Sequence, residues 1–138
     1  MNNVVVSRNS ITVLRIMLSG IFLVAGINHV AVPEGVAKRL TASVMYEFFP
    51  AFIDPKALVI AVGIGLLIGG LLLLANRFTR YAAMLLLALL VPITVSVQLQ
   101  GLETIGPLFK NVAIAGALLF FIKNQFNDNR QINYDKKS

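Results

Sequence analysis

The apolar stretch Ala57–Ala75 constrains the fold of this chain more than any other feature. It reads ALVIAVGIGLLIGGLLLLA and contains no charge, no hydrogen-bonding side chain and no proline. As a helix it would be about 28 Å long, close to the hydrocarbon thickness of a bilayer. A backbone in hydrocarbon must satisfy its own N–H and C=O groups, and a helix does so locally. The stretch therefore predicts a membrane-spanning helix.

Three further apolar stretches have the length of a membrane span. Together they give four predicted spans, at residues 11–32, 57–75, 81–97 and 105–122. The connection Asn76–Arg80 is so short that the helices on either side of it must run antiparallel. Pro92 lies inside the third span, where proline removes a backbone hydrogen bond and favours a kink.

The loop between the first two spans, residues 33–55, carries a helical pattern of its own. Apolar residues recur at four-residue spacing beside basic ones, at Val36, Leu40, Val44 and Phe48. This pattern is typical of a short amphipathic helix at the membrane interface, with a lid over a binding site as the alternative role. We therefore expect an all-α, polytopic membrane protein, a four-helix transmembrane bundle with a short interfacial helix in its first loop.

The composition agrees with this class and excludes several functions. The hydrophobic fraction is 57%, and there is no cysteine and one histidine. Disulfides, thiolate metal sites, iron–sulfur ligation and a bis-histidine haem within one chain are thereby excluded. The net charge of +6 comes from basic residues that flank the apolar spans, which indicates contact with the lipid bilayer and not with nucleic acid. We expect no metal site and no catalytic residue set, so catalysis by the chain alone is not expected.

The distribution of lysine and arginine predicts an orientation. Four spans place both termini and the Asn76–Arg80 connection on one side of the membrane, and eight of the twelve basic residues lie there. The positive-inside rule assigns that side to the cytoplasm. Residues 1–10 are then a short cytoplasmic N-terminus and residues 123–138 a polar cytoplasmic tail.

Small residues mark two candidate packing faces. Ala61, Gly65 and Gly69 share one face of the second span and include a GxxxG motif. Small residues let membrane helices approach closely, so we expect this face to contact another helix, of the same chain or of a second copy. In the fourth span Ala113 and Ala117 share a face with Lys110, which predicts that this lysine also faces other helices.

The first span carries an unusual polar face. Arg15, Ser19, Phe22, Gly26 and His29 follow helical spacing and lie on one side. Ionisable residues at membrane depth usually face protein or water, so Arg15 is a candidate buried charge inside the bundle. The alternatives are that Arg15 reaches back to the headgroups and that His29 simply ends the helix.

The predicted topology gathers polar residues at the end of the bundle opposite the termini. They are Asn28, His29, Gln98, Lys110 and Asn111. A pocket holding an imidazole, a lysine and amides against apolar helices could bind a small polar headgroup such as a quinone carbonyl. Histidine could also carry the proton that accompanies quinone reduction. The alternative is that these groups only cap helices.

These residues also carry a family resemblance. The chain resembles the DoxX family of small four-helix membrane proteins in three places: the run Arg15–His29, the glycine–leucine second span ending at Leu74, and the run Pro107–Leu119. Members often carry an acidic residue early in the second helix, whereas this chain has Val62-Gly63 in that region. The resemblance implies a multi-pass protein of the bacterial inner membrane that serves beside a redox enzyme; some relatives belong to thiosulfate:quinone oxidoreductases.

Three functional hypotheses follow from these observations. The first is an accessory or anchor subunit of a membrane redox complex, with a redox-enzyme partner and a quinone contact. The second is a small-molecule carrier or channel component that works as a homo-oligomer packed through its GxxxG face. The third is a structural assembly factor. An identified quinone or oxidoreductase partner would favour the first hypothesis, and substrate flux through liposomes containing only this chain would favour the second.

Overall fold

A computed structural model describes residues 6–48, 50–98 and 105–124. In chain order its elements are α1 (Arg8–Ala31), α2 (Pro33–Thr41), the 3₁₀ helix η1 (Val44–Phe48), α3 (Pro55–Leu74), α4 (Thr79–Gln98) and α5 (Ile105–Lys123). Helices α1, α3, α4 and α5 are long and apolar enough to cross a membrane. The expected all-α, four-helix membrane architecture is thereby confirmed. Most of the predicted polar tail, from residue 125 onward, lies outside the described residues, as do residues 1–5.

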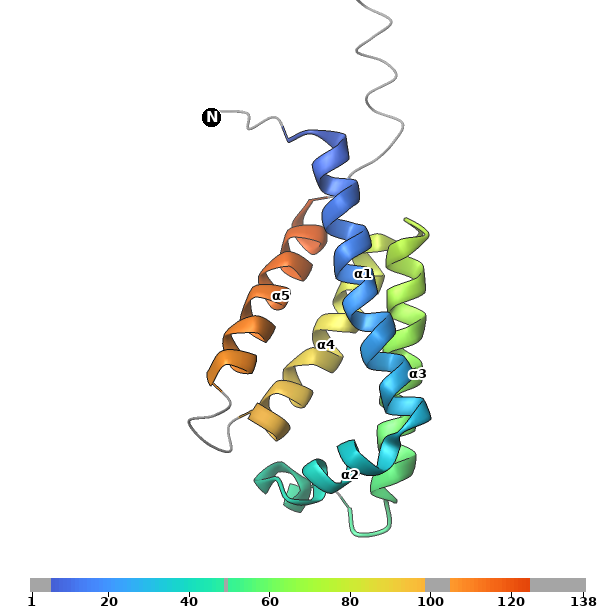
Figure 1. The fold of residues 1–138 in the computed structure, drawn as a ribbon, viewed down its shortest axis with the longest axis vertical. Helices are drawn as coiled ribbons and strands as arrows, with labels where there is room; N and C mark the ends of the chain where they lie inside the picture. The colour runs from blue at the N-terminus through green and yellow to red at the C-terminus, as the bar shows by residue number, and fades with distance from the viewer. Residues whose placement is uncertain (1–5, 49, 99–104, 125–138) are drawn as a thin grey trace, which may run out of the picture.

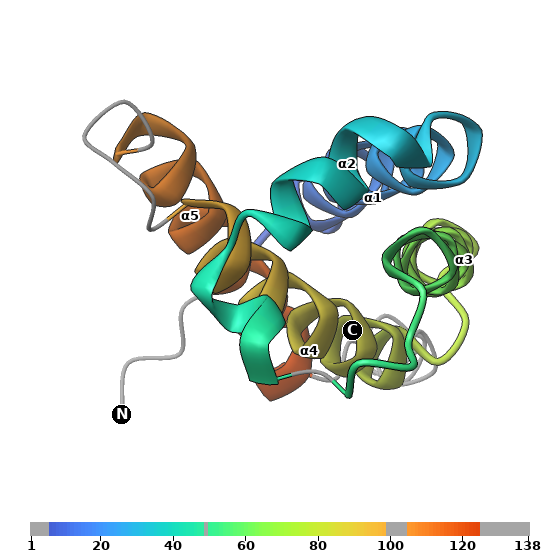
Figure 2. The same cartoon turned by 90° about the horizontal axis from the view of Figure 1, so that it is seen from below.

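The four long helices run along the long axis, and α2 and η1 lie crosswise at one end (Figure 1). The start of α1, the α3–α4 connection and the end of α5 share the opposite end. Seen from below, α4 lies between α3 and α5, while α1 packs along α3 (Figure 2). Helix α4 therefore contacts both α3 and α5, and α2 lies across the end where α1 and α3 meet.

The helix ends follow from local capping chemistry. The side chain of Ser7 accepts a hydrogen bond from the N–H of Ser10 at the start of α1, and Asp54 caps α3 through the N–H groups of Lys56 and Ala57. Such caps satisfy backbone donors that a helix leaves unpaired at its start. At the other end of α3 the chain turns through Asn76, whose φ of 55° lies in the left-handed region that asparagine tolerates. The turn is short enough to set α4 beside α3.

The core lies where α1, α3, α4 and α5 meet. Its most deeply buried large side chains are Phe22, Leu66, Leu73, Leu86, Leu118 and Phe121. Many equally apolar side chains point outward; Met17 is 67% exposed and Val24 is 61% exposed. Apolar surface on this scale is unusual for a soluble monomer and is expected for helices surrounded by lipid. The burial pattern therefore agrees with the membrane assignment.

Glycines bring α3 close to two neighbours at once. A Cβ added to Gly26 would lie 2.9 Å from the carbonyl oxygen of Gly63, so the backbones of α1 and α3 touch here. On another face of α3, Cβ atoms at Gly65 and Gly69 would lie 2.8 Å from Leu89 and 2.6 Å from Leu86. The helix facing this GxxxG is therefore α4 of the same chain. Ala61, grouped with these glycines from its spacing, is exposed, and the role of Gly63 was not anticipated.

Helix α5 packs through a different face from the one predicted. Its buried residues are Asn111, Ile114, Leu118 and Phe121. Lys110 and Ala113 are exposed and Ala117 is half-buried. The expectation that Lys110 faces other helices is therefore wrong within this chain. The glycines of α5 do not set a close approach, because a Cβ added at Gly106 or Gly116 would meet nothing within 4 Å.

Candidate functional site

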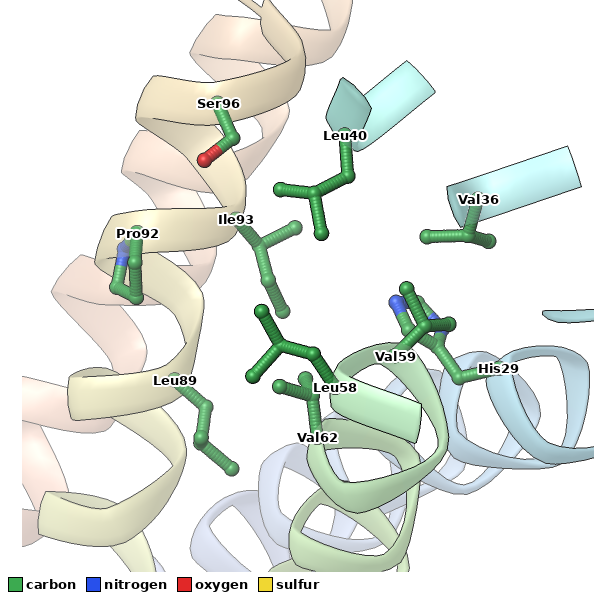
Figure 3. Close-up of a pocket in the computed structure, with 10 residues that line it drawn as sticks. All are labelled: His29, Val36, Leu40, Leu58, Val59, Val62, Leu89, Pro92, Ile93 and Ser96. Carbon is green, nitrogen blue, oxygen red and sulfur yellow. The ribbon is translucent and has the colours of Figure 1, made fainter. Parts of the chain in front are cut away.

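An apolar cavity of about 120 Å³ lies where α1, α2, α3 and α4 meet, at the end opposite the start of α1 and the end of α5. Its lining is drawn in Figure 3 and consists of His29, Val36, Leu40, Leu58, Val59, Val62, Leu89, Pro92, Ile93 and Ser96. Eight of these ten residues are aliphatic or proline. The two polar members, His29 and Ser96, come from α1 and α4. The cavity is thus an apolar site with few polar groups, the usual character of a small-molecule site.

Helix α2 provides one wall of the cavity. Its apolar residues Val36 and Leu40 line the cavity, whereas Lys38 and Arg39 between them are exposed. Pro33 at the first position fixes the start of the helix, where the missing N–H costs nothing. The amphipathic pattern of the first loop therefore covers a cavity with its apolar face, which favours the lid alternative for this segment.

The imidazole of His29 is held in one orientation by its own helix. Its Nδ1 lies 2.7 Å from the carbonyl oxygen of Ala25, one turn earlier. A carbonyl oxygen can only accept, so Nδ1 carries the hydrogen. Gly63 makes room for the side chain, because a Cβ there would lie 2.7 Å from the Cβ of His29. The ring is thus fixed between α1 and α3 with its other nitrogen, Nε2, not used by this bond.

Ser96 is the second polar residue of the lining. It is only 5% exposed, and in Figure 3 its oxygen is turned toward its own helix, α4. Ser96 already has an interaction within the molecule. Among the described residues that line the cavity, His29 is the only titratable one.

The structure separates the residues of the predicted polar pocket. Asn28 and Lys110 are exposed, His29 lines the cavity, and the side chain of Gln98 lies outside the part of the chain that the structure describes. Asn111 is buried between α4 and α5 and donates to the Thr94 hydroxyl at 2.9 Å. Of the four whose side chains the structure describes, His29 alone lines the cavity, and these four do not form one pocket.

Arg15 lies on the packed side of α1, one turn before the fully buried Ser19. It is half-buried, and its Nε is buried without a hydrogen-bond partner among the described residues. The Ser19 hydroxyl donates to the Arg15 carbonyl oxygen at 2.7 Å, a bond within the helix that leaves the guanidinium unaffected. Arg15 is thus a partly buried cation in a spanning helix, remote in sequence from His29 by almost four helical turns.

The Asn111–Thr94 hydrogen bond ties α5 to α4. Thr94 in turn donates to the carbonyl oxygen of Leu90 at 2.7 Å, so the three groups form a chain across the helix contact. Side-chain hydrogen bonds between membrane helices contribute about 0.6 kcal/mol on average, with a maximum near 1.7 kcal/mol.

We expect a coupling energy of about 1 kcal/mol between Asn111→Ala and Thr94→Val in a double-mutant cycle. Unfolding by a denaturing detergent from mixed micelles would measure it. Asn124→Ala is the control: Asn124, which directly follows α5, donates to the carbonyl oxygen of Phe120 and should show no coupling to Thr94→Val. Strict additivity of the Asn111 and Thr94 effects would contradict the assignment.

A salt bridge joins the covering helix to α3. Lys56 near the start of α3 pairs with Glu34 in the first turn of α2. Both side chains are more than half exposed, so the pair contributes little to global stability. The hydrogen bond from Lys56 holds the pKa of Glu34 below its ordinary value. The pair therefore links the first turn of α2 to the start of α3.

The sign of the pH effect follows from this shift. Because the pKa of Glu34 is lower in the folded protein, its stabilising contribution is present above the unfolded-state pKa and is lost as the pH falls through the folded-state value. We expect Lys56→Met to raise the pKa of Glu34 toward its ordinary value, as measured by carboxyl ¹³C NMR titration. Lys123→Met, at the far end of the bundle, should leave it unchanged; a Glu34 pKa that does not respond to Lys56→Met would contradict the pairing.

The cavity was not predicted from the sequence, and most of its lining could not have been. Val59, Val62 and Ile93 are ordinary apolar residues of spanning helices and carry no signal that separates a cavity wall from a lipid-facing surface. Two signals were present: the amphipathic pattern of the first loop and the lone histidine at the end of the first span. Together they point to the correct end of the bundle.

The model of the DoxX family matches residues 10–99, well over half of the chain. The chain belongs to the DoxX family. The matched part of this DoxX protein includes every residue that lines the cavity, whereas α5 and the run Pro107–Leu119 lie beyond it. No curated protein and no solved structure matches the chain significantly.

Proposed function

We propose that this DoxX protein holds the ring of a quinone-type lipid in the cavity beside His29, as an accessory or anchor subunit of a membrane redox complex. The proposal places it in the bacterial inner membrane with both termini in the cytoplasm, as the distribution of basic residues indicates. The observation that carries the proposal is a ring-sized apolar cavity in a membrane protein, with one imidazole in its wall.

The size of the cavity suits a six-membered ring. An apolar cavity of roughly 150 Å³ binds benzene, and the cavity here has about 120 Å³. It is also partly open, so substituents and a lipid tail can extend outside it. Its aliphatic walls match the faces of a ring, and the single imidazole can contact an oxygen on the ring edge.

The redox chemistry itself is assigned to a partner. Reduction of a quinone to a quinol takes up two electrons and two protons. The chain has no cysteine for iron–sulfur ligation or covalent haem attachment, and its one histidine lines the cavity. We therefore propose that the electrons come from a partner subunit, and that this chain binds and orients the ring in the membrane.

The packing of α3 favours this function over a homo-oligomeric carrier. The carrier hypothesis needs the GxxxG face to contact a second copy of the chain. Gly65 and Gly69 instead meet Leu89 and Leu86 of α4 in the same chain. Because α4 already covers the GxxxG face, this face is not available to contact a second copy of the chain, as the carrier hypothesis requires.

Purification in mild detergent, lipid extraction and identification of co-purifying quinones and proteins would test the proposal. We expect a quinone and an oxidoreductase subunit. A short-chain quinone analogue, supplied in each redox form, should raise the thermal unfolding temperature of the wild type. His29→Ala should lose most of the protection given by the reduced, hydroxyl-bearing form, whereas Lys110→Ala, which changes an exposed residue of α5, should retain it. Absence of protection by either redox form, or equal protection of both variants, would contradict the proposal.

A further inference from the structure

We infer that the cavity binds the reduced, hydroxyl-bearing form of its ring ligand more tightly than the oxidised form, because neutral His29 offers it a hydrogen-bond acceptor. This inference rests on the proposed function and adds to it the chemical class that the site selects. The class is a ring that carries a hydroxyl donor, such as a quinol or a phenol.

The tautomer of His29 is set by its partner. Nδ1 lies 2.7 Å from the Ala25 carbonyl oxygen, which has no hydrogen to give. Nδ1 must therefore be the protonated nitrogen, and in the neutral ring Nε2 then carries a lone pair and no hydrogen. The polar group that the ring can present to a ligand is an acceptor.

The other residues of the lining offer few polar groups that could take the place of the His29 acceptor. The side chains of Val36, Val59 and the other aliphatic residues provide only carbon, and Ser96 already has an interaction within the molecule. In Figure 3 the His29 ring lies beside Val59 and below Val36, on the side of the cavity across from Ser96. A hydroxyl on the ligand can donate to Nε2, whereas a quinone carbonyl would set two acceptors against each other and leave both without a donor.

The expected preference follows from the worth of one hydrogen bond. A net contribution of about 0.5–1.5 kcal/mol corresponds to about two- to tenfold tighter binding of the hydroxyl-bearing form. Tighter binding of the reduced member raises the midpoint potential of a bound couple. A tenfold preference would raise it by about 30 mV for two electrons, making the bound quinone a better electron acceptor for the partner.

The single histidine allows a direct test. In protein labelled with ¹⁵N only in histidine, every imidazole signal comes from His29. In lipid nanodiscs, at a pH where the spectrum is that of the neutral ring, we expect Nδ1 to be protonated and Nε2 bare. Addition of 4-methylphenol should shift the Nε2 resonance upfield, as for an acceptor gaining a donor. p-Xylene, which replaces the hydroxyl by a methyl of similar size, should bind about two- to tenfold more weakly and leave Nε2 nearly unshifted.

Two variants make the result specific. Ser96→Ala should keep the preference for 4-methylphenol, and His29→Leu should bind both compounds equally, as followed by methyl ¹³C shifts of cavity-lining valines. An Nε2-protonated tautomer, equal affinities in the wild type, or a preference retained in His29→Leu would overturn the inference. If neither compound perturbs His29 or the lining valines, the proposed ring site itself fails, which is a distinguishable outcome.

Discussion

Replacing Gly63 by leucine should force α1 and α3 apart and lower the free energy of unfolding by about 3 kcal/mol. The reason is that the new side chain has no space. A Cβ alone would lie 2.7 Å from the Cβ of His29 and 3.1 Å from the carbonyl oxygen of Gly26. One of these atoms is backbone and the other belongs to a side chain held against its own helix, so neither can move cheaply. Overpacking a close contact costs about 1–3 kcal/mol, and occasionally more.

Unfolding of purified protein in mixed micelles by a denaturing detergent would measure this effect. The matched control is Gly20→Leu, because Gly20 lies on α1 and an added Cβ there meets nothing within 4 Å. Leucine is also the better helix former, so this control should be neutral or slightly stabilising. If Gly63→Leu were as stable as Gly20→Leu, the close approach of α1 and α3 would be wrong.

Filling the cavity should abolish ligand binding. In Val62→Phe a phenyl ring would extend from α3 into a cavity of about 120 Å³ that is itself the size of one ring. We expect protection by the quinone analogue to disappear, which corresponds to at least about tenfold weaker binding. The readout is the ligand-induced rise in unfolding temperature, which scales with the ratio of ligand concentration to Kd.

Val91→Phe provides the control for this substitution. Val91 is 53% exposed on α4 and lies outside the cavity lining, so the same change there should leave the protection as large as in the wild type. Full protection of Val62→Phe would show that the analogue binds elsewhere. Loss of protection in both variants would point to an indirect effect and would equally count against the cavity.

Helix α2 shows how far local patterns can be extended. Its spacing and composition predict a short amphipathic helix through Val36, Leu40, Val44 and Phe48. The structure has an amphipathic helix at Pro33–Thr41, and Val44–Phe48 form the separate 3₁₀ helix η1. The same pattern left open whether the apolar face meets lipid or protein. That choice depends on where α3 and α4 lie, because Val36 and Leu40 line the cavity only when those helices supply its other walls.

The polar residues at this end of the bundle show the limit of arguing from topology. Topology placed His29 and Asn111 at the same end, which is correct, but it did not place them in one site. The difference is a matter of rotation: α5 turns Asn111 toward Thr94 and leaves Lys110 exposed. Successive residues of an α-helix point about 100° apart. Two residues at the same end of the bundle can therefore face different neighbours and need not line the same pocket.

The sequence by itself determined the number of spans, their antiparallel order and the class of the protein, because length and hydropathy decide what can cross a bilayer. Its residue pattern also determined its membership of the DoxX family. Only the tertiary structure decided which faces pack and where a cavity remains. The physical reason is that lipid is as apolar as a helix interface. In water a buried face reveals itself by hydrophobicity, whereas in a bilayer Val62 in a cavity wall and Val91 outside the cavity lining are the same residue type, and shape alone separates them.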